Sequence, residues 1–179
     1  MTAMDLPATG WRLPDDACET IAALVKEHRP DLIVECGSGR STIVLAEALR
    51  DNGSGTVVAL EHHWDYWAET VRLLEERDLQ EYAQVRQSHL AEGWYARETW
   101  ADLGGIGMLL VDGPPRKTAR HARAPALTLL HDCLLPGCVI VLDDIDRDDL
   151  YGPEITELRE RMTVVGEGRP RLGWWIHEG

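Results

Sequence analysis

The sequence predicts an α/β fold: a doubly wound, mostly parallel sheet of seven strands with helices on both faces and an antiparallel hairpin at its C-terminal end. Two observations carry this prediction. Short apolar runs rich in Val, Ile and Leu alternate with segments of helical periodicity, a pattern typical of a parallel sheet covered on both faces. The last two strand-like runs are separated by too few residues for a helical crossover, so they are expected to pair antiparallel.

The apolar runs and the helix signals between them place each expected element. Strands are expected at about 31–36, 56–61, 83–88, 107–112 and 138–144, with the hairpin at 163–167 and 172–177. Helices are expected at 14–29, 41–50, from 65, at 125–134 and from 153, where Pro or Asp marks most of the starts. Residues 89–105 fit no single pattern. The length suits one domain, at 14–179, after an N-terminal arm of residues 1–13.

Charge and composition narrow the classes of partner. The chain has 31 Asp and Glu against 18 Lys and Arg, a net charge of −13. Binding to nucleic acid relies on a Lys/Arg surface that neutralises phosphates, so this balance argues against a nucleic-acid partner. The sequence has no apolar run long enough to span a bilayer and no signal-peptide pattern, so we expect a cytoplasmic protein without a membrane partner.

The first expected strand ends in a carboxylate and a glycine turn. Glu35 closes the apolar run, and Gly37 and Gly39 follow before the next helix. Glycines at such a turn let the backbone bend sharply and let a ligand lie against it. An ordinary strand-to-helix turn has the same appearance, so this motif alone does not define a site.

Polar residues at the ends of the other strands carry more information. The expected strand ends bear Glu35, Glu61, Ser88, Asp112, Asp143 and Asp144. Ligands of such sheets bind outside the carboxyl ends of the strands. A dinucleotide site has a third glycine where this chain has Thr42, and its pyrophosphate would meet the charge of Glu35. An acidic rim favours a ligand with a cationic centre, such as S-adenosylmethionine.

Several motifs together resemble the class I S-adenosylmethionine-dependent methyltransferases, in particular small bacterial members with acidic positions like those of catechol O-methyltransferases. The motifs are Gly37-Ser38-Gly39-Arg40-Ser41-Thr42, Glu61-His62, Val111-Asp112-Gly113-Pro114-Pro115, Ala122-Arg123-Ala124-Pro125-Ala126-Leu127 and Leu142-Asp143-Asp144. This resemblance spans about residues 14–178 and implies a Rossmann-like methyltransferase fold.

The resemblance also implies which residues hold S-adenosylmethionine. Its methionine part would lie against Glu35, Gly37 and Gly39, with Ser41 and Thr42 at its carboxylate. Glu61 would accept hydrogen bonds from the ribose hydroxyls, and His62, Ser88 and His89 would flank the adenine. Asp112 is assigned to the cofactor and also to a metal.

A metal site follows from the same resemblance. Asp112, Asp143 and Asp144 match the Asp…Asp-Asn metal triad of the catechol O-methyltransferase-like enzymes, with Asp144 in place of Asn. Three oxygen ligands with open positions suit Mg²⁺, which would lower the pKa of an acceptor hydroxyl and orient its oxygen. Lys117 and His121 are the candidate catalytic bases.

The favoured function is therefore metal-assisted O-methylation of a small hydroxylated acceptor, with S-adenosylmethionine and Mg²⁺ as cofactors. A metal-independent methyltransferase acting on another small-molecule or sugar group is the first alternative. Alternatives of other classes are a nicotinamide-dependent oxidoreductase and a non-catalytic module that binds a cofactor. The partner is expected to be the small-molecule acceptor, and a homodimer is left open.

Overall fold

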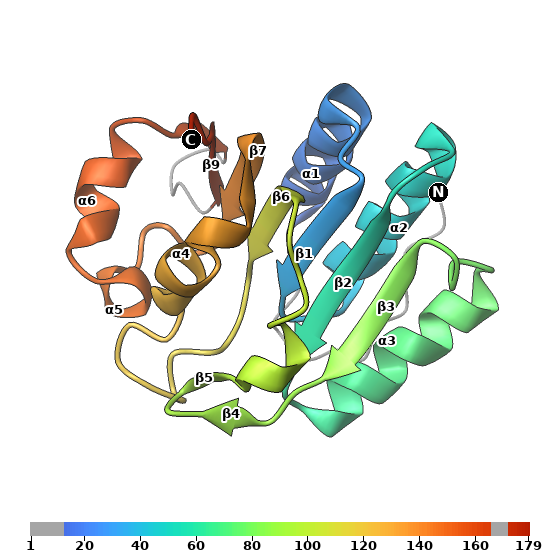
Figure 1. Cartoon of the computed structure of the whole chain (residues 1–179), viewed down its shortest axis with the longest axis horizontal. Coiled ribbons are helices and arrows are strands. Elements are labelled where there is room, and N and C mark those ends of the chain that lie inside the picture. The colour runs from blue at the N-terminus through green and yellow to red at the C-terminus, as the bar shows by residue number, and fades with distance from the viewer. Residues whose placement is uncertain (1–12, 166–171) are drawn as a thin grey trace.

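A seven-stranded sheet forms the centre of the molecule (Figure 1). The computed structural model describes residues 13–165 and 172–179. In spatial order the strands are β3 (Ala83–Gln87), β2 (Thr56–Glu61), β1 (Leu32–Cys36), β6 (Ile106–Val111), β7 (Leu134–Leu142), β9 (Leu172–Ile176) and β8 (Thr163–Val165). The first five run parallel, whereas β9 is antiparallel to both β7 and β8. This topology confirms the predicted fold class, with β9 inserted between β7 and the outer strand β8.

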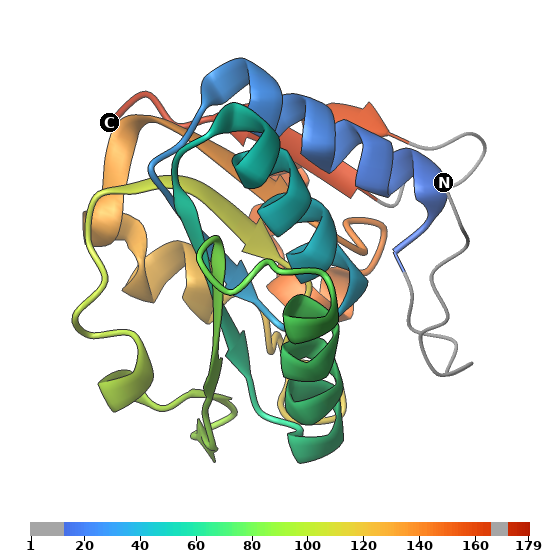
Figure 2. The same ribbon diagram turned by 90° about the vertical axis from the view of Figure 1, so that its right-hand side faces the viewer.

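Helices cover the two faces of the sheet as two separate groups (Figures 1 and 2). One face carries α1 (Asp15–His28), α2 (Arg40–Asn52) and α3 (Trp64–Glu76). The other carries α4 (Pro125–Leu129), α5 (Asp148–Tyr151), α6 (Glu154–Arg159) and the small hairpin of β4 (Leu90–Ala91) and β5 (Trp94–Tyr95). Short 3₁₀ turns, η1 (Arg97–Thr99) and η2 (His131–Cys133), complete the second layer.

The central strands β1, β2, β6 and β7 each supply side chains to both hydrophobic cores. In β1, Ile33 packs in the core under α1, α2 and α3, while Val34 and Cys36 pack in the core on the opposite face. This alternation follows from the pleat of a strand, in which successive side chains point to opposite faces. The continuous apolar runs seen in the sequence are therefore strands buried on both sides.

Two expected boundaries differ clearly from the structure. The helix expected at 125–134 ends at Leu129, and β7 already begins at Leu134. Pro136 lies within β7, where the pairing with β6 shifts register between Ile106 and Met108. Proline cannot donate to a β-ladder, so such an irregular stretch is where a strand tolerates it. The short helix α5 was not predicted, and β4 and β5 lie in the segment that fitted no pattern.

Some expectations concern residues that the structure does not describe. Residues 1–12 of the predicted arm and residues 166–171 of the predicted hairpin lie outside the described ranges. Within those ranges, none of the helices has the length and apolar character needed to cross a membrane.

Candidate functional site

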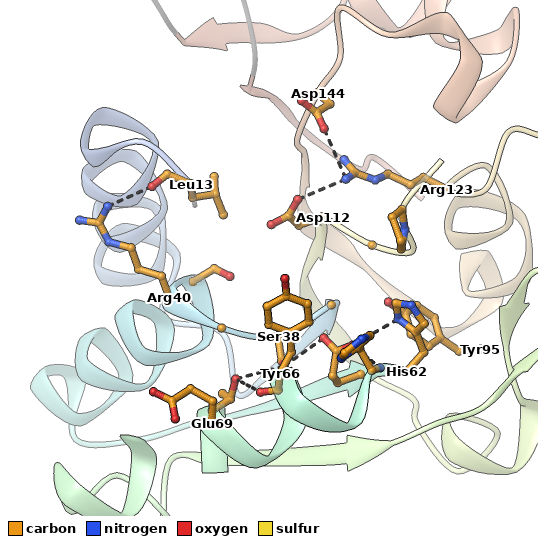
Figure 3. A pocket seen from close by; sticks show the side chains of 18 of the residues that line it. Leu13, Ser38, Arg40, His62, Tyr66, Glu69, Tyr95, Asp112, Arg123 and Asp144 are labelled. Atoms are coloured by element: carbon orange, nitrogen blue, oxygen red, sulfur yellow. Dashed lines mark hydrogen bonds and ion pairs between the residues drawn. The ribbon is translucent and has the colours of Figure 1, made fainter. Parts of the chain in front are cut away.

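A cavity of about 230 Å³ opens at the carboxyl ends of the parallel strands. Its walls come from the turn after β1, the start of α3, β5 and the loop after β6 (Figure 3). The lining side chains include Ser38, Arg40, Glu61, His62, Tyr66, Glu69, Tyr95, Asp112, Lys117, Arg123 and Asp144. This is where ligands of doubly wound sheets bind, so the cavity is the candidate site.

The glycine turn between β1 and α2 forms one edge of the cavity. Gly37 and Gly39 both line it and have φ angles of 104° and 139°, a region that side-chain-bearing residues rarely adopt. A Cβ atom added at Gly39 would meet no atom within 4 Å, so the turn presents bare backbone to open space. A ligand can therefore lie directly against this turn.

Glu35 holds the turn through hydrogen bonds with the start of α2 and does not line the cavity. It is fully buried, and the hydroxyls of Ser41 and Thr42 each donate to one of its oxygens, Thr42 at 2.6 Å. The Thr42 hydroxyl also accepts the N–H of Gly39 at 3.0 Å. Burial raises the pKa of Glu35 to about 7, and the two hydrogen bonds oppose that rise.

These contacts give three side chains predicted to bind the cofactor other partners within the chain. Glu35 was expected to touch the methionine part of a cofactor, but strand alternation points it under α2, on the same face as Ile33. The hydroxyls of Ser41 and Thr42 were expected at the cofactor carboxylate, but they are occupied by Glu35. Ser41 still lines the cavity, whereas Thr42 is fully buried. These three side chains hold the turn in shape.

Glu61, at the end of β2, faces the cavity and is fixed by neutral donors. Its Oε1 accepts the backbone N–H of His63 at 2.7 Å, and its Oε2 accepts the Ser38 hydroxyl at 3.1 Å. Nδ1 of His62 lies 3.2 Å from Oε1. The carboxylate is only 5% exposed and is still part of the cavity wall. It is thus a positioned acceptor that no Lys or Arg among the described residues pairs with.

Tyr95 is a cavity residue that sequence reasoning missed. Its ring packs edge-on against His62, with centroids 6.5 Å apart. The hydroxyl is buried and has no hydrogen-bond partner in the described part of the chain. It lies so close to the backbone after β6 that a Cβ atom added at Gly113 would be 2.5 Å from it. Burial raises the pKa of Tyr95, which keeps the hydroxyl protonated as a donor.

Arg123 lies among the three aspartates at the ends of β6 and β7, and Figure 3 shows its contacts with Asp112 and Asp144. One terminal nitrogen, Nη2, is 3.3 Å from Asp112 and 3.5 Å from Asp144. The other, Nη1, donates to the backbone carbonyl of Asp143 at 2.9 Å and lies 3.9 Å from its carboxylate. The Arg123 side chain is 3% exposed. A buried cation thus occupies the cluster that the sequence assigned to a metal.

The cluster shifts the pKa values of its members. Burial and the charge of Asp143 raise the pKa of Asp112 well above its ordinary value, and Arg123 opposes this rise. Burial would lower the pKa of Arg123, but Tyr151 and Asp112 beside it keep that pKa above its ordinary value. Over residues 13–165 and 172–179, no group of three or more His, Cys, Asp or Glu side chains is arranged to hold a metal ion.

The remaining predicted site residues divide between cavity and surroundings. Lys117 lines the cavity, but His121 does not; its ring accepts a hydrogen bond from Arg120 at 3.2 Å. Ser88 is buried, with its hydroxyl 2.9 Å from that of Thr99. His89 is 71% exposed beside Glu98. Asp143 is fully buried behind the wall. Ser88, His89 and His121 do not line the cavity, and the contacts predicted for them stay predictions.

The chain is similar in sequence to a family of known proteins. A family model described as a methyltransferase domain matches residues 34–145, more than half of the chain. The chain therefore belongs to this family of methyltransferase domains, and it is an S-adenosylmethionine-dependent methyltransferase of the class I fold, as the motifs predicted. A search of curated proteins finds no match.

Solved structures share the fold at low sequence identity. An O-methyltransferase from Bacillus cereus in complex with SAH is 20% identical, with a TM-score of 0.72, 94% of this chain covered and 84% of that one. The O-methyltransferase TomG from Streptomyces achromogenes, in complex with SAM, is 18% identical, with a TM-score of 0.71 and coverages of 98% and 84%. An RNA methyltransferase from Salinibacter ruber, in complex with S-adenosyl-L-homocysteine, is 18% identical, with a TM-score of 0.61 and coverages of 92% and 92%.

Proposed function

We propose that the chain transfers a methyl group from S-adenosylmethionine to an oxygen of a small hydroxylated acceptor. The observation that carries the proposal is the pairing of a bare glycine turn with Glu61 in one cavity. The chain's net charge of −13 disfavours a polyanionic acceptor such as RNA. The O-methyltransferases among the structural neighbours support oxygen as the methylated atom.

The cavity offers each part of the cofactor a suitable neighbour. The backbone of Gly37 and Gly39 suits the methionine part, and Glu61 suits the ribose hydroxyls, because a fixed carboxylate accepts two donors. His62 and the buried Tyr95 suit the edge of the adenine. Glu61, the wall carboxylate without a Lys or Arg partner among the described residues, favours the positive sulfonium over a phosphate.

Methyl transfer is a displacement at carbon. The acceptor oxygen forms a bond to the methyl carbon while the carbon–sulfur bond breaks, and the electron pair of that bond leaves with the sulfur as a neutral thioether. The acceptor proton must go to a base or to water, and Lys117 is the candidate base that lines the cavity. Much of the rate comes from holding oxygen and methyl carbon in line within the cavity.

Magnesium does not fit the acid cluster as it stands. The guanidinium of Arg123 already contacts Asp112 and Asp144, and the carboxylate of Asp143 is buried behind it. A site for Mg²⁺ would need several oxygens free to approach to about 2.1 Å. No step of the proposed reaction therefore passes through a metal, and the arrangement supports the metal-independent alternative.

The test measures cofactor affinity with a matched pair of variants. S-adenosylhomocysteine and NADH are titrated calorimetrically into the wild type, Glu61→Gln and Glu69→Gln. We expect S-adenosylhomocysteine to bind and NADH to give no heat. Glu61→Gln should weaken binding by about 1–3 kcal/mol, roughly 5- to 150-fold, because the ribose hydroxyls lose a charged acceptor.

Glu69 is the matched control because it also lines the cavity but is paired with Arg72. Glu69→Gln should bind nearly as the wild type does. Equal affinities for all three proteins would remove Glu61 from the cofactor site, and binding of NADH alone would overturn the proposed function.

A further inference from the structure

The motif Ala122-Arg123-Ala124-Pro125 contributes no residue to the cofactor or the reaction described above. Arg123 lies just before the start of α4, and its backbone N–H donates to the carbonyl of Leu150 at 2.9 Å. This contact ties the segment before α4 to α5 and directs the side chain inward, between the ends of β6 and β7. The burial of a whole arginine at this point needs an explanation.

The guanidinium is matched to its surroundings on both terminal nitrogens. Nη2 bridges Asp112 and Asp144, which come from two different strand ends (Figure 3). Nη1 contacts both the carbonyl and the carboxylate of Asp143. A planar, permanently charged group with several donors suits such a multi-oxygen environment better than an ammonium does. Each predicted metal ligand is thus a partner of this one side chain.

A divalent ion and this guanidinium compete for the same oxygens. An ion bound to Asp112 Oδ1 at about 2.1 Å would lie no more than about 5.4 Å from Arg123 Nη2, since that nitrogen is 3.3 Å from the oxygen. At such a distance two cations repel strongly in a buried setting. Arg147, 3.5 Å from Asp144, adds a second positive charge on the outer side.

We propose that Arg123 is the resident cation of the acid cluster, which holds the ends of β6 and β7 together and excludes a divalent metal ion. Its consequence, that methyl transfer here proceeds without a metal, rests on the proposed function. The exclusion itself does not, because it concerns only the side chains of this chain. Arg123 is a positioning residue: it sets the direction of Asp112, whose carboxylate forms part of the cavity wall.

The experiment measures metal binding directly, with Mn²⁺ and Mg²⁺ as probes and no cofactor or acceptor present. Free Mn²⁺ is followed by electron paramagnetic resonance, and the melting temperature is recorded with MgCl₂ and with EDTA. The proteins are the wild type, Arg123→Met, Arg123→Lys and Arg147→Met. Arg147→Met is the matched control because it removes a cation from Asp144 and leaves Arg123 in place.

We expect the wild type, Arg123→Lys and Arg147→Met to bind no Mn²⁺ at millimolar concentration and to melt at the same temperature with Mg²⁺ or EDTA. Arg123→Met should gain one Mn²⁺ site, and Mg²⁺ should raise its melting temperature, because an ion that binds only the folded state stabilises it. A purely structural role for Arg123 would give no such gain.

Stoichiometric Mn²⁺ binding by the wild type would overturn the proposal, and so would a folded Arg123→Met that gains no metal affinity. Should Arg123→Met not fold without metal, recovery of its fold with Mg²⁺ supports the proposal, and failure to recover contradicts it. S-adenosylhomocysteine binding is measured in parallel on the wild type, to separate the proposed function from the proposed exclusion of metal. If the wild type does not bind it, the proposed function is wrong, and the result for the metal is unchanged.

Discussion

Two acidic regions of one sheet edge bind their partners in different ways. At β1 and β2, Glu35 and Glu61 accept hydrogen bonds from hydroxyls and a backbone N–H, all neutral donors. At β6 and β7, the carboxylates instead surround the guanidinium of Arg123. In the first region the charge of Glu61 remains on the open cavity wall. In the second region the positive charge of Arg123 largely neutralises the carboxylates. A carboxylate at a strand end is therefore not informative about its ligand until its partner in the protein is known.

The largest expected effect comes from removing the charge that distinguishes the second region. Arg123→Met should lower the free energy of unfolding by about 3–5 kcal/mol, because it leaves buried carboxylates without their cation. Urea denaturation of the wild type and the variant, in EDTA, measures this loss. Arg147→Met, whose side chain is 38% exposed, should lose much less. Equal losses in the two variants would mean that Arg123 is not the main counter-charge.

Unfolding free energy measured over a series of pH values tests the first region, where no cation offsets the cost of burying the Glu35 carboxylate. The pKa of Glu35 is raised to about 7 in the folded protein, against 4.5 ordinarily, so the folded state retains its proton between these values. The stability due to protonated Glu35 is fully present below about pH 4.5 and is lost as pH rises to about 7. Relative to Glu35→Gln, the wild type should lose about 3 kcal/mol of unfolding free energy across this window. A pH-independent difference between the two proteins would contradict this assignment.

A smaller effect is expected where the two regions meet. Gly37 belongs to the first region and Gly113 follows Asp112 of the second, and their backbones touch. A Cβ atom at Gly113 would lie 2.5 Å from the Tyr95 hydroxyl and 3.2 Å from the backbone of Gly37, so Gly113→Ala must displace the Tyr95 side chain and crowd the Gly37 backbone. We expect a loss of about 1–3 kcal/mol in unfolding free energy, measured by denaturation.

Gly104→Ala is the control for this overpacking, because its Cβ atom would meet nothing within 4 Å. It should leave the unfolding free energy close to that of the wild type. If Gly113→Ala is as stable as Gly104→Ala, then the glycine turn and the loop after β6 do not form one rigid unit.

The fold could be predicted from the sequence because its signals are local. Each buried strand is one continuous apolar run, such as the one that becomes β6, and helices are marked at their ends by Pro, Asp or Gly. The strand ends then follow, and with them the positions of Glu61, Asp112 and Asp144. The expected helix at 125–134 was too long because Leu134 to Leu142 form a strand that includes a proline.

The partners of the acids could not be predicted because they depend on contacts distant in the sequence. Arg123 is 20 residues from Asp143, and its side chain is directed inward by a backbone contact with Leu150, which is also distant in the sequence. Tyr95 comes from a hairpin of two-residue strands, too short for any periodicity. For Glu35 part of a signal did exist: alternation along β1 places it on the face of Ile33, under α2, where Thr42 donates to it.

The most direct test of the contrast between the two regions is a calorimetric titration of S-adenosylhomocysteine into wild-type protein, once after exhaustive treatment with EDTA and once in millimolar Mg²⁺. We expect one binding site with a micromolar dissociation constant, about −8 kcal/mol, and the same affinity in both conditions, because the first region binds the cofactor and Arg123 fills the second. No binding in either condition, or binding that appears only with Mg²⁺, would contradict this expectation.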